Sequence, residues 1–121
     1  MTSMALGDQM VKVDKPWGGF LQVAHNEPCT VKILTVIPGE ATSLQSHQHR
    51  DELWIVLDEG LEVEVDGLRI SPKPGETVTV PRTSRHRLSC AGPRPARILE
   101  VSFGTFDEED ITRYEDRYGR V

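Results

Sequence analysis

Short apolar segments separated by turn residues recur along the chain. Residues 30–37 are rich in β-branched side chains and end at Pro38-Gly39, and residues 52–57 form a second apolar run. Residues 61–65 alternate apolar and acidic side chains and are followed by Asp66-Gly67, a strong hairpin signal. An alternation with a period of two places successive side chains on opposite faces of a strand. The pattern therefore predicts β-strands that bury one face.

Further apolar segments extend this pattern toward the C-terminus. Strands are expected over residues 77–80, 86–90 and 96–103, each bounded by proline or glycine. Turn signals at intervals of roughly 8 to 12 residues are typical of a sandwich or a barrel. We predict one small all-β barrel over residues 1–121, with residues 1–12 loosely ordered.

The C-terminal segment has a different periodicity. Asp107 is suited to cap a helix, and the acidic residues that follow it would favour the helix dipole. Ile111, Tyr114 and Tyr118 recur at helical spacing. A short helix is expected over residues 107–118.

Composition narrows the classes of function. The 121 residues include 14 Lys and Arg against 19 Asp and Glu, a formal net charge of −5. This balance argues against a general nucleic-acid binder, which needs a basic face. No apolar run approaches the roughly 20 residues that span a bilayer, and the N-terminus does not resemble a secretory signal. Cys29 and Cys90 have neither metal nor redox spacing. We expect a cytoplasmic domain with reduced thiols and no membrane partner.

Histidines concentrate the candidate chemistry. Residues two apart on an extended strand point to the same side, so Gln45, His47 and His49 would project together. Glu52 opens the next apolar run, and His86 opens a later strand. Imidazole nitrogens and a carboxylate oxygen from neighbouring strands suit zinc, iron, manganese or nickel. A His-x-His pair also arises by chance, so the surrounding spacing decides.

Two segments resemble the paired motifs of the cupin superfamily. Residues 39–52 have the glycine, histidine and glutamate spacing of the first motif, and residues 75–86 have the glycine, proline and histidine spacing of the second. Thr83 replaces the usual glycine of the second motif. The resemblance implies a double-stranded β-helix, a jelly-roll barrel, which agrees with the strand pattern. The metal ligands that it implies are Gln45, His47, Glu52 and His86.

The first motif departs from the common cupin form. Gln45 stands where most cupins have a histidine, and His49 is additional. The His-Arg-x-Glu-x-Trp sequence of residues 49–54 resembles type II mannose-6-phosphate isomerase, a cupin domain often found at the C-terminal end of mannose-1-phosphate guanylyltransferases. Residues 15–18 and 115–120 resemble the same family, so the resemblance covers essentially the whole domain. The nucleotide-binding half of the bifunctional proteins is not in this sequence, so guanylyltransferase activity is not expected.

The resemblance implies a metal-dependent isomerase that interconverts mannose 6-phosphate and fructose 6-phosphate. Two imidazoles, one carboxylate and a neutral glutamine oxygen suit Zn²⁺ most readily, with Fe²⁺, Mn²⁺, Co²⁺ and Ni²⁺ as alternatives. In a second reading, His49 binds the metal and Gln45 only hydrogen-bonds within the barrel. His49 or Glu100 would carry the proton. An unperturbed histidine changes its charge near neutral pH, and Glu100 is a charged residue within an apolar strand.

Arginines would hold the phosphate, because a guanidinium group binds phosphate oxygens in pairs. The arginines that match the family pattern are Arg50, Arg87, Arg117 and Arg120. The expected partner is a phosphosugar, and a homodimer is expected by analogy with other small cupins. Two other functions stay open, since a fold does not settle an activity: a non-catalytic cupin that binds a sugar or another small ligand, and a metal-dependent oxygenase.

Overall fold

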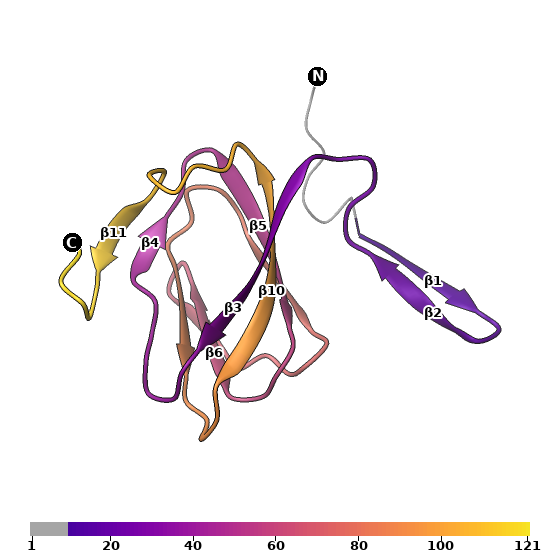
Figure 1. Cartoon of the computed structure of the whole chain (residues 1–121), viewed down its shortest axis with the longest axis horizontal. Coiled ribbons are helices and arrows are strands. Elements are labelled where there is room, and N and C mark those ends of the chain that lie inside the picture. The colour runs from indigo at the N-terminus through magenta and orange to yellow at the C-terminus, as the bar shows by residue number, and fades with distance from the viewer. Residues whose placement is uncertain (1–9) are drawn as a thin grey trace.

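A computed structural model describes residues 10–121 as two facing β-sheets and a separate hairpin (Figure 1). Residues 1–9, on which most of the expected loosely ordered segment falls, lie outside the described residues. The strands are β1 (Val11–Lys15), β2 (Gly18–Gln22), β3 (Cys29–Val36), β4 (Leu44–Ser46), β5 (Arg50–Val56), β6 (Leu61–Val65), β7 (Leu68–Ile70), β8 (Thr77–Val80), β9 (His86–Cys90), β10 (Ala96–Gly104) and β11 (Thr112–Glu115).

The two facing sheets have crossed-over strand orders. One sheet contains four strands in the order β3-β10-β5-β8, and the other contains five in the order β11-β4-β9-β6-β7. Neighbouring strands in both sheets run antiparallel. Strands distant in sequence thus become neighbours, as in a jelly roll. The predicted all-β cupin barrel is confirmed.

The interior between the sheets is apolar at one end and polar at the other. Fully buried side chains such as Val56, Val63 and Ile98 fill the apolar end. Nearer the other end, Glu52 on β5 and Glu100 on β10 are also buried. Both acids continue the inward-facing alternation of their own strands, so the strand period that builds the core also carries two carboxyl groups into the barrel.

The prediction of a helix over residues 107–118 is wrong. The segment contains strand β11, which pairs with the edge of β4. Asp107 accepts a hydrogen bond on its side-chain oxygen from the backbone N–H of Glu109 at 2.9 Å, within a turn instead of a helix. Thr112 and Tyr114 are β-branched and aromatic residues that favour strands. Pairing with β4 satisfies backbone groups on both strands, and this tertiary gain outweighs a weak helical periodicity.

The β1–β2 hairpin stands away from the two sheets (Figure 1). Trp17 at its turn is 74% exposed, and Phe20 and Leu21 on β2 are also exposed. The homodimer expected from the sequence stays a prediction.

The positions of the cysteines and the length of the apolar segments can be compared with the fold. Cys29 is exposed and Cys90 is buried, and the two are not joined in a disulfide. Within residues 10–121 there is no helix of the length and apolar character needed to cross a membrane.

Thr83 adopts a backbone conformation that suits glycine. Its φ angle is +70°, in the left-handed region where a β-branched residue is an outlier. Its backbone N–H donates to the carbonyl oxygen of His47 at 2.7 Å, which links the second motif to the first. The departure from the motif's usual glycine therefore coincides with a strained residue.

Thr83→Gly is expected to raise the free energy of unfolding by about 1 kcal/mol. Glycine adopts the left-handed conformation without the steric cost that a Cβ atom brings, and this gain exceeds the loss from the greater chain entropy of glycine in the unfolded state. Urea denaturation measures the change. Thr79→Gly is the matched control, since Thr79 is exposed within β8, where glycine weakens the strand. A loss of stability in both variants would contradict the assignment of strain to Thr83.

Candidate metal centre

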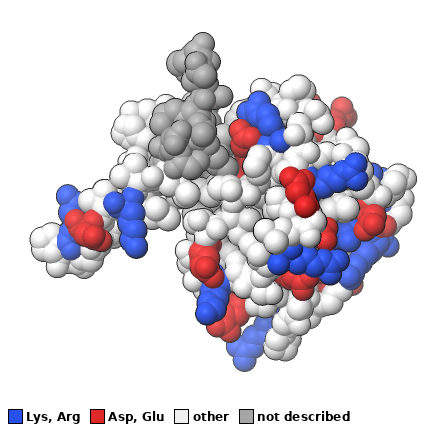
Figure 2. All heavy atoms as spheres, turned by 180° about the vertical axis from the view of Figure 1, so that it is seen from behind, with Lys and Arg blue, Asp and Glu red and all other residues white. Residues whose placement is uncertain are grey.

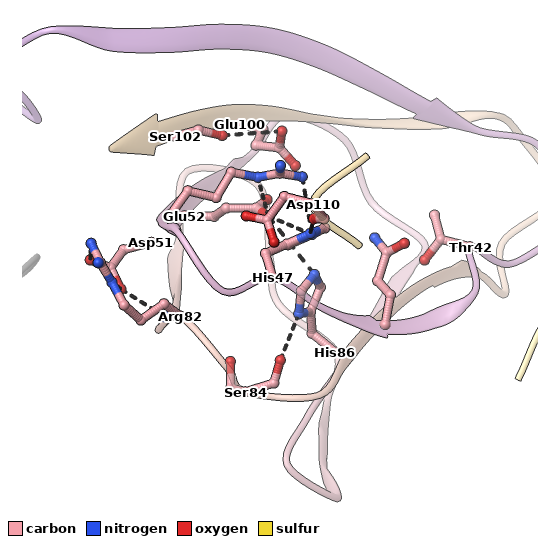
Figure 3. Close-up of polar contacts among 12 residues, drawn as sticks. Thr42, His47, Asp51, Glu52, Arg82, Ser84, His86, Glu100, Ser102 and Asp110 are labelled. Carbon is pink, nitrogen blue, oxygen red and sulfur yellow. Dashed lines mark hydrogen bonds and ion pairs between the residues drawn. The ribbon is translucent and has the colours of Figure 1, made fainter. Parts of the chain in front are cut away.

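Three buried side chains converge inside the polar end of the barrel (Figure 3). His47 follows β4, Glu52 lies on β5 and His86 opens β9. Nε2 of His47 is 3.1 Å from Oε1 of Glu52, and Nε2 of His86 is 3.9 Å from the same oxygen. The three side chains offer ligand atoms that all lie within 4.8 Å of one another. One cation between them can contact all three.

Backbone carbonyls set the orientation of both imidazole rings. Nδ1 of His47 lies 2.7 Å from the carbonyl oxygen of Asp110, and Nδ1 of His86 lies 3.1 Å from that of Ser84. A carbonyl oxygen only accepts hydrogen bonds, so we assign the ring proton to Nδ1 in each case. With the proton assigned to Nδ1, Nε2 of each ring faces Glu52. Metal-binding histidines are held in the same way.

Two buried acceptor atoms of this centre have no hydrogen-bond partner among the described residues. They are Oε1 of Glu52 and Nε2 of His86. The other oxygen of Glu52 accepts a hydrogen bond from Nε1 of Trp54 at 3.1 Å. Buried acceptors without a donor are costly, and a cation would satisfy both atoms at once. Two imidazoles and a carboxylate are also a common donor set for zinc and related metals, so these residues fit a divalent metal ion.

Arg50 contacts two of the three ligands, His47 and Glu52. Its Nη2 donates to Nε2 of His47 at 3.2 Å, its Nη1 donates to the carbonyl oxygen of Asp107 at 3.1 Å, and its Nε lies 3.5 Å from Oε1 of Glu52. The guanidinium group also stacks 4.3 Å from the ring centroid of Phe106. Arg50 thus supplies a positive charge to the buried carboxylate. The hydrogen bond from Arg50 also occupies the lone pair on Nε2 of His47 that a metal ion would need. Metal binding therefore requires the Nη2 group of Arg50 to move away from His47.

Burial and neighbouring charges shift the pKa values of the groups in this centre in different directions. Burial opposes the ionisation of Glu52, but its close neighbours His47, Glu100, His86 and Trp54 bring its pKa below the usual range. Burial lowers the pKa of His86, and the charge of Glu52 only partly opposes this. Burial and the adjoining Glu52 raise the pKa of Glu100 to about 8. At neutral pH the centre therefore holds a carboxylate, a neutral His86 and a protonated Glu100.

Gln45 lies next to the centre on the five-stranded sheet. It is the antiparallel partner of His86, so both side chains occupy the inner face of that sheet. Its Oε1 accepts a hydrogen bond from Oγ of Ser43 at 2.8 Å. Gln45 also lines a cavity of about 540 Å³ that extends to Tyr118 and Arg120, whereas His47, Glu52 and His86 do not line it. Gln45 thus lies between the cavity and the buried trio.

The two predicted proton carriers occupy different environments. β4 ends at Ser46, so the strand alternation expected for residues 45–49 stops before His47. His47 is buried, whereas His49 is exposed, and the backbone N–H of His49 donates to the Asp110 carboxylate at 3.0 Å. Glu100 is buried, accepts a hydrogen bond from Oγ of Ser102 at 3.5 Å and lies close enough to Glu52 for that carboxylate to raise its pKa. Of the two, only Glu100 lies inside the barrel beside the trio.

Three of the four predicted phosphate-binding arginines are engaged elsewhere. Arg87 points to the opposite face from His86, where it donates to the Thr42 carbonyl and forms an ion pair with Glu115 at 3.1 Å. Arg117 donates to the carbonyl oxygen of Gly39. Arg120 pairs with Asp116 at 2.7 Å. Figure 2 shows basic and acidic side chains interspersed over one face of the molecule, as such pairing requires.

Asp110 is a site residue that the sequence did not single out. Its carboxylate accepts the backbone N–H groups of Gln48 and His49 at 2.9 and 3.0 Å, and its carbonyl oxygen accepts Nδ1–H of His47. Those backbone hydrogen bonds lower the pKa of Asp110 despite an opposing effect of desolvation. Asp110 therefore fixes the turn that carries His47. In the sequence it is one of several acids after Asp107, and only the docking of this segment beside β4 distinguishes it.

Comparisons with known proteins agree with this fold and centre. The family model described as mannose-6-phosphate isomerase C-terminal matches residues 4–116. Mannose-1-phosphate guanylyltransferase ManC of Salmonella typhimurium is 37% identical over 111 residues, which are 91% of this chain and 23% of that protein. Alginate biosynthesis protein AlgA of Pseudomonas putida is 40% identical over 112 residues, 92% of this chain and 23% of that protein. The chain thus spans less than a quarter of the length of these relatives.

Solved structures support the fold alone. The capsular polysaccharide assembling protein CapF of Staphylococcus aureus superposes with a TM-score of 0.67 at 14% identity, over 88% of this chain and 34% of that chain. The Cnp3 cupin domain of Schizosaccharomyces pombe superposes with a TM-score of 0.60 at 14% identity, over 79% and 64% of the two chains. The barrel, the motif spacing and the family match agree, and this chain belongs to the mannose-6-phosphate isomerase C-terminal family of cupin domains.

Proposed function

We propose that this domain is a metal-dependent aldose–ketose isomerase that interconverts mannose 6-phosphate and fructose 6-phosphate. The observation that carries the proposal is the convergence of two imidazole Nε2 atoms and one carboxylate oxygen inside the barrel. Two of these three atoms have no hydrogen-bond partner within residues 10–121. Membership of a family described by mannose-6-phosphate isomerase supports the sugar.

The residues that would hold the metal are His47, Glu52 and His86, with Gln45 as the fourth ligand on the same face as His86. A bound divalent cation would act as a Lewis acid and polarise the sugar carbonyl. Zn²⁺ is preferred for this site over Fe²⁺, Mn²⁺, Co²⁺ or Ni²⁺. Ser43 orients Gln45 through the hydrogen bond to its Oε1.

The reaction moves one proton from C2 to C1 and a second from O2 to O1. Glu100 is proposed to carry the carbon-bound proton, because it is buried on β10 and contacts Glu52. The ionised form of Glu100 would accept the proton at C2 and return it at C1, which is general base and then general acid catalysis by one group. Because the pKa of Glu100 is raised to about 8, this form is the minor one at neutral pH and increases as the pH rises. His49 is less suited to this step, since its side chain is exposed.

One observation favours a different function, a non-catalytic cupin that binds a sugar. The three ligands are nearly inaccessible to solvent, with exposures of 3% for His47 and 1% each for Glu52 and His86. Arg50 supplies a cation to them, which is an arrangement that also stabilises a metal-free barrel. Binding of a sugar without turnover would identify this function.

Co²⁺ is expected to quench the fluorescence of Trp54, because Trp54 donates to Glu52 and its ring centroid lies 5.6 Å from that of His86. The measurement uses Trp17→Phe, which removes the exposed tryptophan at the hairpin turn. Quenching should saturate and should disappear in His86→Ala. The matched control is His25→Ala, where the exposed His25 lies outside the trio. Equal quenching in both histidine variants would contradict a metal site at His86.

Protein reconstituted with Zn²⁺, Mn²⁺, Co²⁺ or Ni²⁺ is expected to convert mannose 6-phosphate to fructose 6-phosphate, as measured by a coupled assay for the product. A chelator should abolish the activity, and so should His47→Ala, which removes one imidazole ligand; His25→Ala should not. If folded, metal-loaded protein shows no turnover with any of the four ions, the isomerase proposal fails for this substrate.

Glu100→Gln is expected to lower kcat by about 100-fold or more while metal binding is kept, because the amide cannot accept the proton from C2. Steady-state kinetics and Co²⁺ quenching of Trp54 give the two readouts. Glu59→Gln removes an exposed carboxylate in a loop and should leave both unchanged. Unchanged kcat in Glu100→Gln would return the proton step to His49.

A further inference from the structure

Arg113 occupies a position that only the sheet register reveals. It is the antiparallel partner of Gln45 on β4, and Gln45 is the antiparallel partner of His86 on β9. Residues directly opposite each other in antiparallel strands project from the same face of the sheet. His86 faces the barrel interior, where its ring packs against Trp54. Arg113, Gln45 and His86 therefore form a row across the inner face of the five-stranded sheet.

The side chain of Arg113 has no polar partner among the described residues. Its Nε is inaccessible to solvent and makes no hydrogen bond, and within residues 10–121 its side chain forms neither a hydrogen bond nor an ion pair. By contrast, Arg87, Arg117 and Arg120 are each held by a carbonyl or a carboxylate. A half-buried cation with an unsatisfied N–H is unfavourable unless a ligand pairs with it.

The ligand that this group suits is an oxyanion. A guanidinium group stays charged and offers N–H donors in a planar fork that matches phosphate oxygens. Glu52 and Glu100 on the facing sheet already contact His47, Trp54 and each other, so they do not supply the anion. We infer that Arg113 binds the phosphate group of the sugar phosphate. The inference rests on the proposed function for the identity of the sugar.

The spacing of the row gives the ligand a direction. Arg113 and His86 lie on strands separated by β4, so their backbones are about 10 Å apart at the usual interstrand distance. An open-chain six-carbon sugar phosphate can extend along that distance, with its carbonyl end near His86 and its phosphate near Arg113. Gln45 lies between them and is the one member of the row that lines the cavity, so a ligand would approach the row past Gln45.

The experiment compares the binding of mannose 6-phosphate, mannose and inorganic phosphate to the full, Zn²⁺-loaded chain by isothermal titration calorimetry. Arg113→Met is expected to weaken mannose 6-phosphate binding by about 10- to 100-fold, as expected for the loss of a charge-assisted contact. Mannose binding and Co²⁺ quenching of Trp54 should not change. Arg94→Met is the matched control, because Arg94 is exposed in the loop between β9 and β10.

The outcomes separate this inference from the isomerase proposal. If mannose 6-phosphate binds in an Arg113-dependent way but is not converted, the inference is supported and the isomerase proposal is rejected. Turnover with an unchanged KM in Arg113→Met overturns the inference and leaves the isomerase. An equal loss of mannose, phosphate and Co²⁺ binding also overturns it, because that pattern indicates a structural role. So does wild-type protein that binds mannose and mannose 6-phosphate equally.

A conservative variant covers the case in which Arg113→Met does not fold. Arg113→Lys keeps the charge but not the planar fork, so it should bind mannose 6-phosphate with an affinity below that of the wild type and keep Co²⁺ quenching. Wild-type affinity in Arg113→Lys, with Arg113→Met unfolded, would overturn the inference.

Discussion

The carboxylate of Glu52, buried at 1% exposure, is the constraint around which the polar end of the barrel is built. A buried charge is costly unless hydrogen bonds and an opposite charge compensate it. Trp54 donates to one of its oxygens, while His47, His86 and the guanidinium group of Arg50 surround the other. These groups come from β5, from the turn after β4 and from β9, so the charge can be held only when both sheets are assembled.

The same centre poses a conflict between stability and function. Arg50 compensates Glu52 in the folded chain, yet its N–H occupies the lone pair of His47 that a metal ion would use. Metal binding would therefore exchange one positive charge for another at almost the same place. Functional sites commonly retain such unsatisfied or competing groups at a cost in stability. The unpartnered atoms of Glu52 and His86 are the clearest sign of it.

The two sheets contribute different chemistry to the interior. The four-stranded sheet supplies the acids Glu52 and Glu100, whereas the five-stranded sheet supplies Gln45, His86 and Arg113. A ligand between the sheets would meet carboxyl groups on one side and neutral or cationic donors on the other. That polarity suits a sugar phosphate, whose hydroxyl groups can contact either side and whose phosphate needs the cationic one.

Sequence alone predicted the strands that form most of the two sheets, because strand periodicity and turn residues act over a few positions, but it did not predict the β1–β2 hairpin. The resemblance to the cupin motifs selected His47, Glu52 and His86, which the structure brings together. The sequence pattern also predicted a helix where β11 forms, and it placed His49 on the same side as His47. Only the tertiary structure decided these points. Whether residues 112–115 become a strand depends on the free edge of β4, which is about 70 positions away in sequence. Contacts between segments distant in sequence likewise decided three further features, which no local pattern encodes. They are the end of β4 at Ser46, the hydrogen bonds that Asp110 accepts from the following turn, and the row of Arg113, Gln45 and His86 on the inner face.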